Sequence, residues 1–460
     1  MEIYNKFQQD SAQKAFDTEH RRKIAFNISR YNDAVEKGKL QYSNIELAKE
    51  RAACIKHKAI SNLEKYLIDF ETNFEKRGGK VIWAQNANEA LKEILAILAR
   101  HETTNVVKSK TMVTEEIGFN HALEQAGIES QETDLGEYIV QLAGEAPYHI
   151  VTPAMHKSKE DVAALFHEKF GLKDNSTPAE ITAFVRKLLR EKFLSAGVGV
   201  TGANFLIADI GAVALTENEG NGLMSVSFPK VHIAIAGIEK IIPKLRDLDL
   251  FWPLLATHGT GQYITSYNSI ISGPRQAGET DGPDEMYVVL LDNNRTTLLA
   301  QLHQRRALSC IRCGACLSAC PVYKTIGGHA YCTTYSGPIG AVITPYLRGI
   351  DEFKHLSYAS SLCGSCTEVC PVKINLHKLL LYNRNDAVIA GHSSVSDRFS
   401  MFGLKKIMLH RSYLDKVSAK LKNKALKTFF GKLWGERREL PVVQPKSFKQ
   451  LWEERREEKK

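Results

Sequence analysis

The stretch KVIWAQNANEALKEILAILARHETTNVV, residues 80–107, places an amphipathic segment between short apolar runs at 81–84 and 105–107. Short runs rich in Val and Ile are typical of buried strands, and apolar residues spaced by three and four are typical of a covering helix. The same alternation continues to about residue 150, with a second helix expected over 114–125 and capped by Thr114. This order predicts an α/β domain built on a parallel sheet.

The segments on either side add further elements to this domain. A helix with interleaved charges is expected over 43–77, ahead of the sheet. Segments rich in Val, Ile, Ala and Gly at 197–216 and 231–237 indicate buried strands with no long helix between them. The remaining expected elements are a strand at 149–153, helices at 159–170 and 178–194, and a last buried strand at 286–291.

The motif Gly197-Val-Gly-Val-Thr-Gly202 matches the G-x-G-x-x-G fingerprint of dinucleotide-binding proteins. However, a helix is expected before it and the strand-like run 203–208 follows it, whereas the dinucleotide-binding turn needs a strand first and a helix second. We therefore expect no nicotinamide or flavin site of this type, and the glycines indicate close approach of packed backbone.

The strongest indication of function in the sequence is a cysteine run at 310–321. It reads Cys310-Ile-Arg-Cys313-Gly-Ala-Cys316-Leu-Ser-Ala-Cys320-Pro321, the C-x2-C-x2-C-x3-C-P spacing of bacterial ferredoxins. A tight loop of this kind brings three thiolates around one cubane, and Gly314 lets the backbone come close to its sulfides. A second run, Cys363-Gly-Ser-Cys366-Thr-Glu-Val-Cys370-Pro371, repeats the last three cysteines. The sequence therefore predicts two iron–sulfur clusters.

The crossed ligation of two-cluster ferredoxins predicts which cysteines belong together. The first cluster takes Cys310, Cys313, Cys316 and Cys370, and the second takes Cys320, Cys363 and Cys366. The second cluster then lacks one thiolate, because Ser360 stands where its first cysteine is expected. Three alternatives remain: a three-iron cluster, a four-iron cluster with a serine or water ligand, which we prefer, or recruitment of Cys332. A zinc site also uses C-x2-C pairs but does not account for the third C-x2-C step or the Cys-Pro ending. Cys54, outside both runs, is interpreted as a packed thiol.

Composition bounds the remaining possibilities. The net charge is +9, and the segment 401–460 alone has 17 Lys and Arg against 7 Asp and Glu. Basic and acidic residues alternate there, which is typical of a solvated helix and not of a nucleic-acid site; docking on an acidic partner or contact with a membrane surface stays open. The first residues lack a secretory signal and no run approaches the ~20 apolar residues of a membrane span, so a cytoplasmic protein is expected. Nine cysteines in that compartment favour metal ligation over disulfides.

Several motifs in order resemble lactate utilisation protein B. They are the stretch 107–116, the segment 132–139, the run 201–211 with 217–222, and both cysteine runs. The resemblance implies a LUD domain, an α/β fold related to the sugar-phosphate isomerase and CoA-transferase group, followed by a small α-helical ferredoxin-like two-cluster domain. It also implies that Cys310, Cys313, Cys316, Cys320, Cys363, Cys366 and Cys370 are the cluster ligands, whereas Cys332 does not match a ligand position.

The function implied by the resemblance is that of an iron–sulfur electron-transfer subunit in a bacterial complex that oxidises L-lactate to pyruvate. The implied partners are a cysteine-rich subunit and a second LUD protein, and the electron acceptor is open. Two alternatives give the LUD domain its own role. Glu217 or Glu219, in a glycine-rich turn, would act as a CoA-transferase-like nucleophile, or Lys108, Lys110, His156 and Lys157 near strand ends would bind an organic acid. His329 is interpreted either as a neighbour that tunes a cluster or as a packed histidine.

The predicted domain boundaries follow from these segments. They are a helical N-terminal segment at 1–77, a LUD domain at 78–300, a two-cluster iron–sulfur domain at 301–385 and a basic helical tail at 386–460.

Overall fold

The computed structural model describes residues 2–434 and 439–458. The chain divides into two units, Met1–Ala387 and Val388–Lys460. The second unit is helical and contains α20 (Val395–Leu409), α21 (Arg411–Lys416), α22 (Ala419–Trp434) and α23 (Phe448–Glu457). In the described part of the chain, no helix combines the length and the apolar character needed to cross a bilayer.

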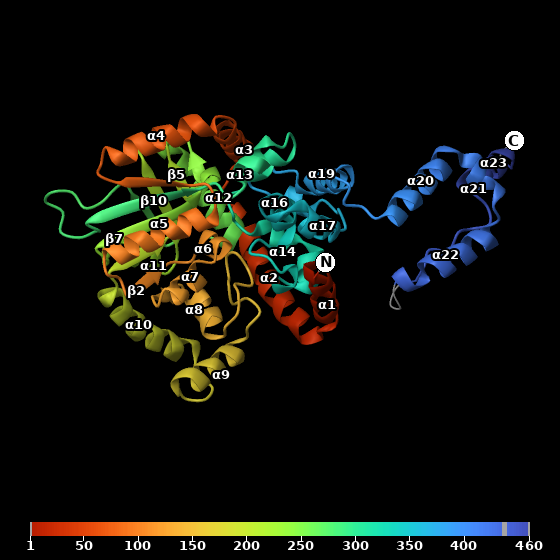
Figure 1. Ribbon diagram of the computed structural model, residues 1–460. Helices are drawn as coiled ribbons and strands as arrows, with labels where there is room; N and C mark the ends of the chain where they lie inside the picture. The colour runs from red at the N-terminus through yellow and green to blue at the C-terminus, as the bar shows by residue number, and fades with distance from the viewer. Residues whose placement is uncertain (1, 435–438, 459–460) are drawn as a thin grey trace. The chain divides into compact units, whose positions relative to one another are not determined.

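A six-stranded sheet forms the centre of the first unit (Figure 1). Its strand order is β1-β10-β7-β4-β2-β3, and every neighbouring pair is parallel. The strands are β1 (Lys80–Ala84), β2 (Asn105–Lys108), β3 (Glu129–Glu132), β4 (Val198–Thr201), β7 (Val231–Gly237) and β10 (Glu285–Leu291). The central strand β7 is buried along its whole length, as expected for a parallel sheet covered on both faces. The predicted α/β fold class is confirmed.

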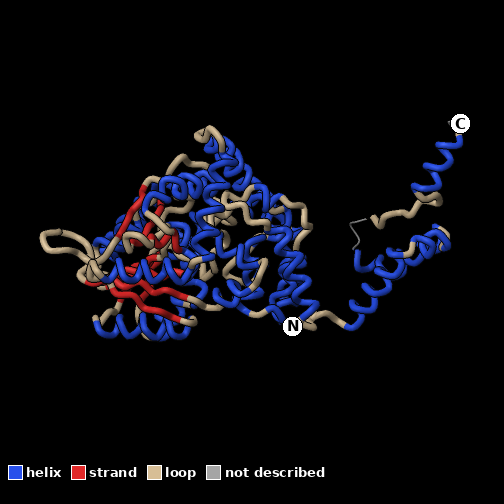
Figure 2. The backbone as a smooth tube through the Cα atoms, turned by 90° about the horizontal axis from the view of Figure 1, so that it is seen from above, coloured by secondary structure: helices blue, strands red, loops and turns tan. Residues whose placement is uncertain are grey.

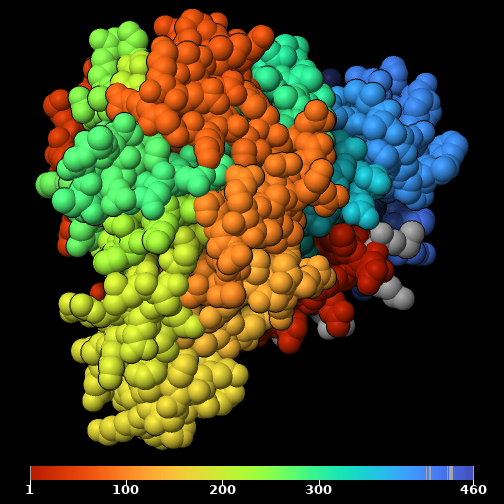
Figure 3. Space-filling model, turned by 60° about the vertical axis from the view of Figure 1, so that its left-hand side comes forward, coloured from red at the N-terminus to blue at the C-terminus, as the bar shows by residue number. Residues whose placement is uncertain are grey.

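Helices cover both faces of this sheet, and Figure 2 shows the strands enclosed between them. Because side chains alternate along a strand, Val106 of β2 packs against α5 to α7, while Val107 packs against α8 to α10 on the opposite face. These helices are α5 (Ala87–Arg100), α6 (Met112–Ile117), α7 (Phe119–Gln125), α8 (Leu135–Leu142), α9 (Lys159–Phe170) and α10 (Pro178–Ser195). Figure 3 shows α9 and α10, in yellow, as one end of the surface on that side.

A second, four-stranded sheet lies against the first sheet through a shared apolar cluster. Its order is β8-β5-β6-β9, with β5 parallel to β8 and antiparallel to β6. The elements of this part are β5 (Phe205–Ile207), β6 (Ala212–Glu217), α11 (Asn221–Ser227), η1 (Ile238–Lys240), β8 (Ile241–Ile242), η2 (Leu245–Asp247), α12 (Leu248–Thr260) and β9 (Tyr267–Ile271). The apolar run 197–216 therefore supplies strands to both sheets, which the sequence did not distinguish.

The cysteine runs lie in a helical region after β10. Its helices are α13 (Arg295–Ala300), η3 (Gln304–Ser309), α14 (Ala315–Ala319), α15 (Pro321–Ile326), η4 (His329–Tyr331), α16 (Gly337–Arg348), α17 (Ile350–Tyr358), α18 (Ser365–Glu368) and α19 (Leu376–Ile389). The N-terminal helices α1 (Glu2–Phe16) and α2 (Thr18–Lys39) lie beside them in Figure 1, and Phe7, Ile24 and Ile28 belong to the same apolar core as the cysteines. The helix expected over 43–77 is two helices, α3 (Ile45–Ser61) and α4 (Leu63–Glu75). The boundaries predicted at residues 77/78 and 300/301 lie inside the first unit and stay predictions.

Two local expectations are wrong. The helix assigned to begin at Thr114 begins at Met112, capped by Thr111, whose hydroxyl accepts the N–H of Val113 at 3.3 Å. Thr114 lies inside the first turn, where its hydroxyl donates to the Thr111 carbonyl at 2.8 Å.

The second error is the strand expected at 149–153, which is a tight loop. The ring nitrogen Nδ1 of His149 accepts the backbone N–H groups of Val151 at 3.1 Å and Thr152 at 3.2 Å. These side-chain bonds use the donors that a strand would have offered to a neighbouring strand.

Two cysteine groups and an adjoining cavity

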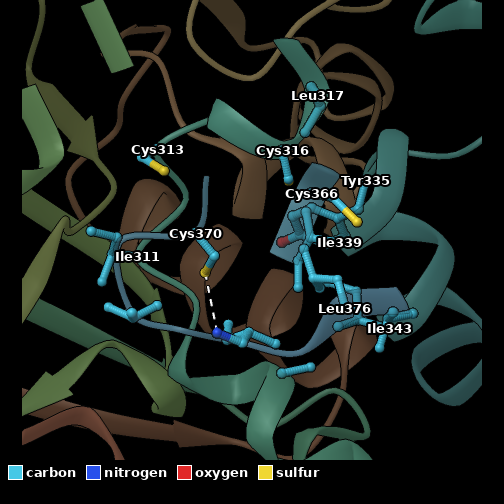
Figure 4. Packing of buried hydrophobic residues seen from close by; sticks show 14 of the residues in the cluster. Ile311, Cys313, Cys316, Leu317, Tyr335, Ile339, Ile343, Cys366, Cys370 and Leu376 are labelled. Atoms are coloured by element: carbon cyan, nitrogen blue, oxygen red, sulfur yellow. Dashed lines mark hydrogen bonds between the residues drawn. The ribbon is translucent and has the colours of Figure 1, made fainter. Parts of the chain in front are cut away.

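The first cysteine run forms a tight loop ahead of α14. Arg312 and Gly314 take positive φ angles of 61° and 79°, and the backbone N–H of Arg312 donates to Cys310 Sγ at 3.4 Å. From the second run, Cys370 accepts the N–H of Ile374 at 3.3 Å, the dashed line in Figure 4. Cys310, Cys313, Cys316 and Cys370 line one pocket together with apolar side chains such as Ile339. The structure thus brings together the four cysteines predicted for the first cluster.

The other three cysteines form a second group. Helix α14, which Cys320 follows, packs against α18, which contains Cys366 and begins two residues after Cys363. Burial, together with repulsion from neighbouring thiolates that include Cys363, raises the pKa of Cys320 and of Cys366. Burial and neighbouring thiolates raise the pKa of Cys366 and of Cys370 to about 11. Crowded, buried thiols of this kind are unfavourable as free anions, and bound metal removes the repulsion by supplying positive charge. Both donor sets therefore fit a cationic iron–sulfur cluster.

The loop at Ser360 repeats the loop at Cys310 in its backbone conformation. Leu362 has a φ of 55°, as Arg312 has 61°, and the glycine before each following helix has nearly the same angles: φ 79° and ψ −8° at Gly314, φ 86° and ψ −14° at Gly364. The N–H of Leu362 donates to Ser360 Oγ at 3.1 Å, the counterpart of the bond to Cys310 Sγ. Ser360 thus occupies the position of a first cysteine, as its sequence spacing predicted.

Two other cysteines lie outside these groups. The Cys332 thiol faces helix α1, where it contacts Asp10 Oδ2 at 3.8 Å, and it also contacts the Ala330 carbonyl at 3.6 Å. Cys54 is exposed, so its interpretation as a packed thiol is wrong. The reason is the orientation of α3, which buries Ala52 and Lys56 and turns Cys54 outward.

A cavity of about 410 Å³ lies next to the first cysteine group. Cys313 lines both this cavity and the pocket shared by the four cysteines. The cavity is also lined by residues that follow the carboxyl ends of parallel strands, among them Ser109 after β2 and Gly202 after β4. Ligands of open α/β sheets bind at this edge. The cavity is thus a candidate binding site that is continuous with the candidate cluster site.

The acidic side chains of the cavity have hydrogen-bond donors of their own. Glu217 accepts the N–H groups of Gly222 at 2.7 Å and Leu223 at 2.8 Å, and Glu219 accepts the N–H of Leu135 at 3.0 Å. Burial raises the pKa of both glutamates. The structure therefore brings both proposed nucleophiles to the cavity, with their carboxylates held by backbone donors.

Among the cations predicted to bind an organic acid, only Lys110 lines the cavity, and it is paired with Asp134 at 3.0 Å. Lys108 is fully buried and paired with Glu132 at 2.7 Å. His156 and Lys157 both pair with Glu145, at 2.6 and 2.5 Å.

His329 contacts the Ala146 carbonyl at 2.7 Å and packs edge-on against His156. In the described contacts it has no cluster cysteine as a partner, which matches the packed-histidine alternative. Lys108, His156, Lys157 and His329 thus lie outside the cavity wall.

Two further cations of the cavity were not found from the sequence. Arg312, inside the cysteine loop, has a side chain only 10% exposed; it pairs with Glu239 at 3.3 Å and stacks over the Tyr335 ring. Lys240 follows the same Glu239, and burial together with repulsion from Arg312 lowers the pKa of Lys240 to about 8. Neither residue belongs to a periodic pattern in the sequence. The two come close together only because η1 packs against the cysteine loop.

Comparison with known proteins gives a family match for the α/β part of the chain and another for the cysteine-containing part. Residues 67–291 match the LUD domain family, and residues 306–374 match the 4Fe-4S dicluster domain family. A solved structure, that of a DUF162 family protein from Deinococcus radiodurans, is 14% identical with a TM-score of 0.29, and the match covers 50% of this chain and 98% of that chain.

Relatives named lactate utilization protein B match almost the whole chain. Those from Bacillus thuringiensis (strain Al Hakam) and Bacillus cereus (strain AH187) are each 42% identical over 426 residues, which is 90% of this chain and 89% of theirs. The chain belongs to the lactate utilization protein B family.

Proposed function

We propose that this protein is an iron–sulfur electron-transfer subunit that serves the oxidation of L-lactate to pyruvate. The observation that carries the proposal is the arrangement of seven cysteines from two separate runs of the sequence into one group of four and one group of three. The family name of the relatives supports a role in lactate utilisation. The match to a dicluster domain supports two clusters of the 4Fe-4S type.

The chain's own residues have defined roles in this proposal. Cys310, Cys313, Cys316 and Cys370 hold the first cluster, and Cys320, Cys363 and Cys366 hold the second. The apolar side chains Ile311, Ile339 and Ile374 exclude water from the first group. Backbone N–H groups directed at Cys310 and Cys370 stabilise the thiolate form of these ligands. The clusters, when bound, supply one-electron redox chemistry.

The same role defines the domains of the chain and its partners. Residues 78–300 form the LUD part and 301–385 the two-cluster part, with 1–77 and 386–460 as helical extensions. The companions are a cysteine-rich subunit and a second LUD protein, and the site of action is cytoplasmic. The second unit supports a docking role, because exposed aromatic residues such as Phe399, Phe402 and Phe429 accompany its lysines.

Anaerobic purification followed by iron and sulfide analysis tests the cluster assignment. The wild type should bind about seven to eight iron atoms, the sum expected for two cubane-type clusters. Cys310→Ala should lose roughly half of them, whereas Cys54→Ala, which removes an exposed thiol outside both groups, should lose none. Zinc in place of iron, or equal iron in both variants, would contradict the proposal.

A further inference from the structure

The acidic and the cationic side chains that line the cavity beside the first cysteine group differ in how many of their polar atoms have a partner within the protein. Glu217 and Glu219 accept backbone N–H groups, and Asp134 pairs with Lys110 and accepts the N–H of Glu137 at 3.1 Å. Each acid of this set thus has a donor within the protein. The cavity therefore does not need a cationic ligand to satisfy its acids.

Two cations that line the same cavity, Arg312 and Lys240, differ from these acids in their hydrogen bonding. Nη1 of Arg312 is buried without a hydrogen-bond partner in the described structure, while Nη2 of the same group reaches Glu239 at 3.3 Å. The ammonium group of Lys240, a half-buried residue of the same cavity, forms no hydrogen bond or ion pair within the described part of the chain. A buried donor without a partner is unfavourable, and a charged acceptor that reaches both groups relieves that cost.

We propose that this cavity binds the carboxylate of a small 2-hydroxy or 2-oxo acid, with Arg312 Nη1 and Lys240 Nζ as its donors. This inference rests on the proposed function for the chemical class of the acid. Apolar side chains such as Met112, Ile150 and Leu255 line the rest of the space and suit the carbon chain of the ligand. The volume exceeds that of a three-carbon acid, so acids with longer side chains also fit.

Arg312 connects the proposed acid-binding site to the loop that would hold the first cluster. Arg312 lies between Cys310 and Cys313, and Cys313 itself lines the cavity. A bound acid therefore lies against the loop that holds the first cluster, and its binding changes the hydrogen bonding of that loop.

Calorimetry on the iron-loaded protein tests the site with L-lactate, pyruvate and inorganic phosphate as separate probes. Lys240→Met should weaken lactate or pyruvate binding about tenfold or more, the loss expected for a charged hydrogen bond. Lys230→Met is the matched control, because Lys230 precedes the same strand β7 that Lys240 follows, and it is exposed. Lys230→Met should bind as the wild type does, and both variants should keep the wild-type iron content.

The results distinguish this site from the electron-transfer role. Lactate or pyruvate should also alter the electron paramagnetic resonance signal of the reduced first cluster in the wild type. No binding of either acid, binding of phosphate alone, or equal binding by the two lysine variants overturns the cavity assignment while iron analysis still supports the clusters. Absence of iron overturns the proposed function instead.

A second inference comes from the repeated loop and does not depend on the cavity. We infer that Ser360 Oγ is the fourth protein ligand of the second cluster. The Ser360 loop repeats both positive φ angles and the N–H bond of the Cys310 loop, so Oγ occupies the position of a ligand sulfur. Cys332, the alternative, directs its thiol to Asp10 on helix α1.

Substitution of Ser360 tests this ligand by spectroscopy. Ser360→Ala should lose one iron and give the signal of an oxidised three-iron cluster, which is paramagnetic where an oxidised four-iron cluster is not. Ser360→Cys should keep four irons and change the signal of the reduced second cluster. The neighbouring Ser361→Ala, which alters an exposed side chain, should match the wild type. Wild-type spectra for both Ser360 variants overturn the assignment.

Discussion

Replacement of Arg295 by Met should destabilise the first unit strongly. Arg295 is 1% exposed and lies between two buried carboxylates: Nε donates to Glu239 at 2.6 Å, and Nη1 and Nη2 donate to Glu116 at 2.9 and 2.8 Å. Removing one partner of a buried ion pair costs about 3–5 kcal/mol, because the remaining charge has no compensation. Arg312 also reaches Glu239, at 3.3 Å, which places this substitution near the lower part of that range.

The loss should appear in the thermal midpoint. An unfolding entropy of about 2.1 cal/mol/K per residue, applied to a unit that ends at residue 387, gives about 0.8 kcal/mol/K. A loss of about 3 kcal/mol then lowers the midpoint by roughly 4 °C. Differential scanning calorimetry on samples of equal iron content measures this shift. Arg275→Met is the matched control, because Arg275 pairs with Asp284 at the surface, where ion pairs contribute about 0–1 kcal/mol.

The pH dependence gives an independent check on the same network. Burial alone would raise the pKa of Glu239, but attraction from Arg295 and Arg312 outweighs burial and holds this pKa at about 2, below the ordinary 4.5. The stabilisation is therefore complete above pH 4.5 and is lost as the pH falls toward 2, so the difference between wild type and Arg295→Met should shrink over that interval. A midpoint for Arg295→Met equal to that of Arg275→Met at neutral pH would refute the reasoning.

Three further results are expected. Gly199→Ala would place a Cβ 1.7 Å from the Ser225 carbonyl oxygen and should lower the midpoint by several degrees, whereas Gly403→Ala, with no atom within 4 Å, should not. Burial lowers the pKa of His232 to about 3, so stability should fall as the pH drops below 6.5, by about 1.4 kcal/mol per unit for this group, and His232→Asn should show a shallower fall in calorimetry. Cys332→Ser should retain the wild-type iron content, and a loss of iron would restore this thiol as a ligand candidate.

The grouping of the cysteines was predictable because ligation depends on short spacings. Cys310 and Cys313 reach one pocket through a loop whose shape is set within five residues, and the Cys-Pro ending redirects the chain locally. The buried strands were predictable for a similar reason, because their whole apolar runs lie inside the sheet. Ser360 was recognisable from spacing as well, although its resemblance to Cys310 in backbone conformation required the structure.

The cavity was not predictable, because its residues come from distant parts of the chain. Lys240 lies about seventy positions before Arg312, and only the packing of η1 against the cysteine loop brings them to one wall. Local competition explains the smaller errors. Thr111, not Thr114, caps the helix that was expected to begin at Thr114. The ring of His149 accepts the backbone N–H groups that an expected strand would have donated to a neighbouring strand.

The shared core of the N-terminal helices and the cysteine region has a consequence for biosynthesis. Phe7 packs 6.3 Å from the ring of Tyr331 and 5.0 Å from that of His355, measured between ring centroids. A ribosome makes α1 long before it makes these partners, so the apolar face of α1 stays uncovered during most of translation. The core around the cysteine loops is therefore completed only when α1 packs against helices that are synthesised about three hundred residues after it.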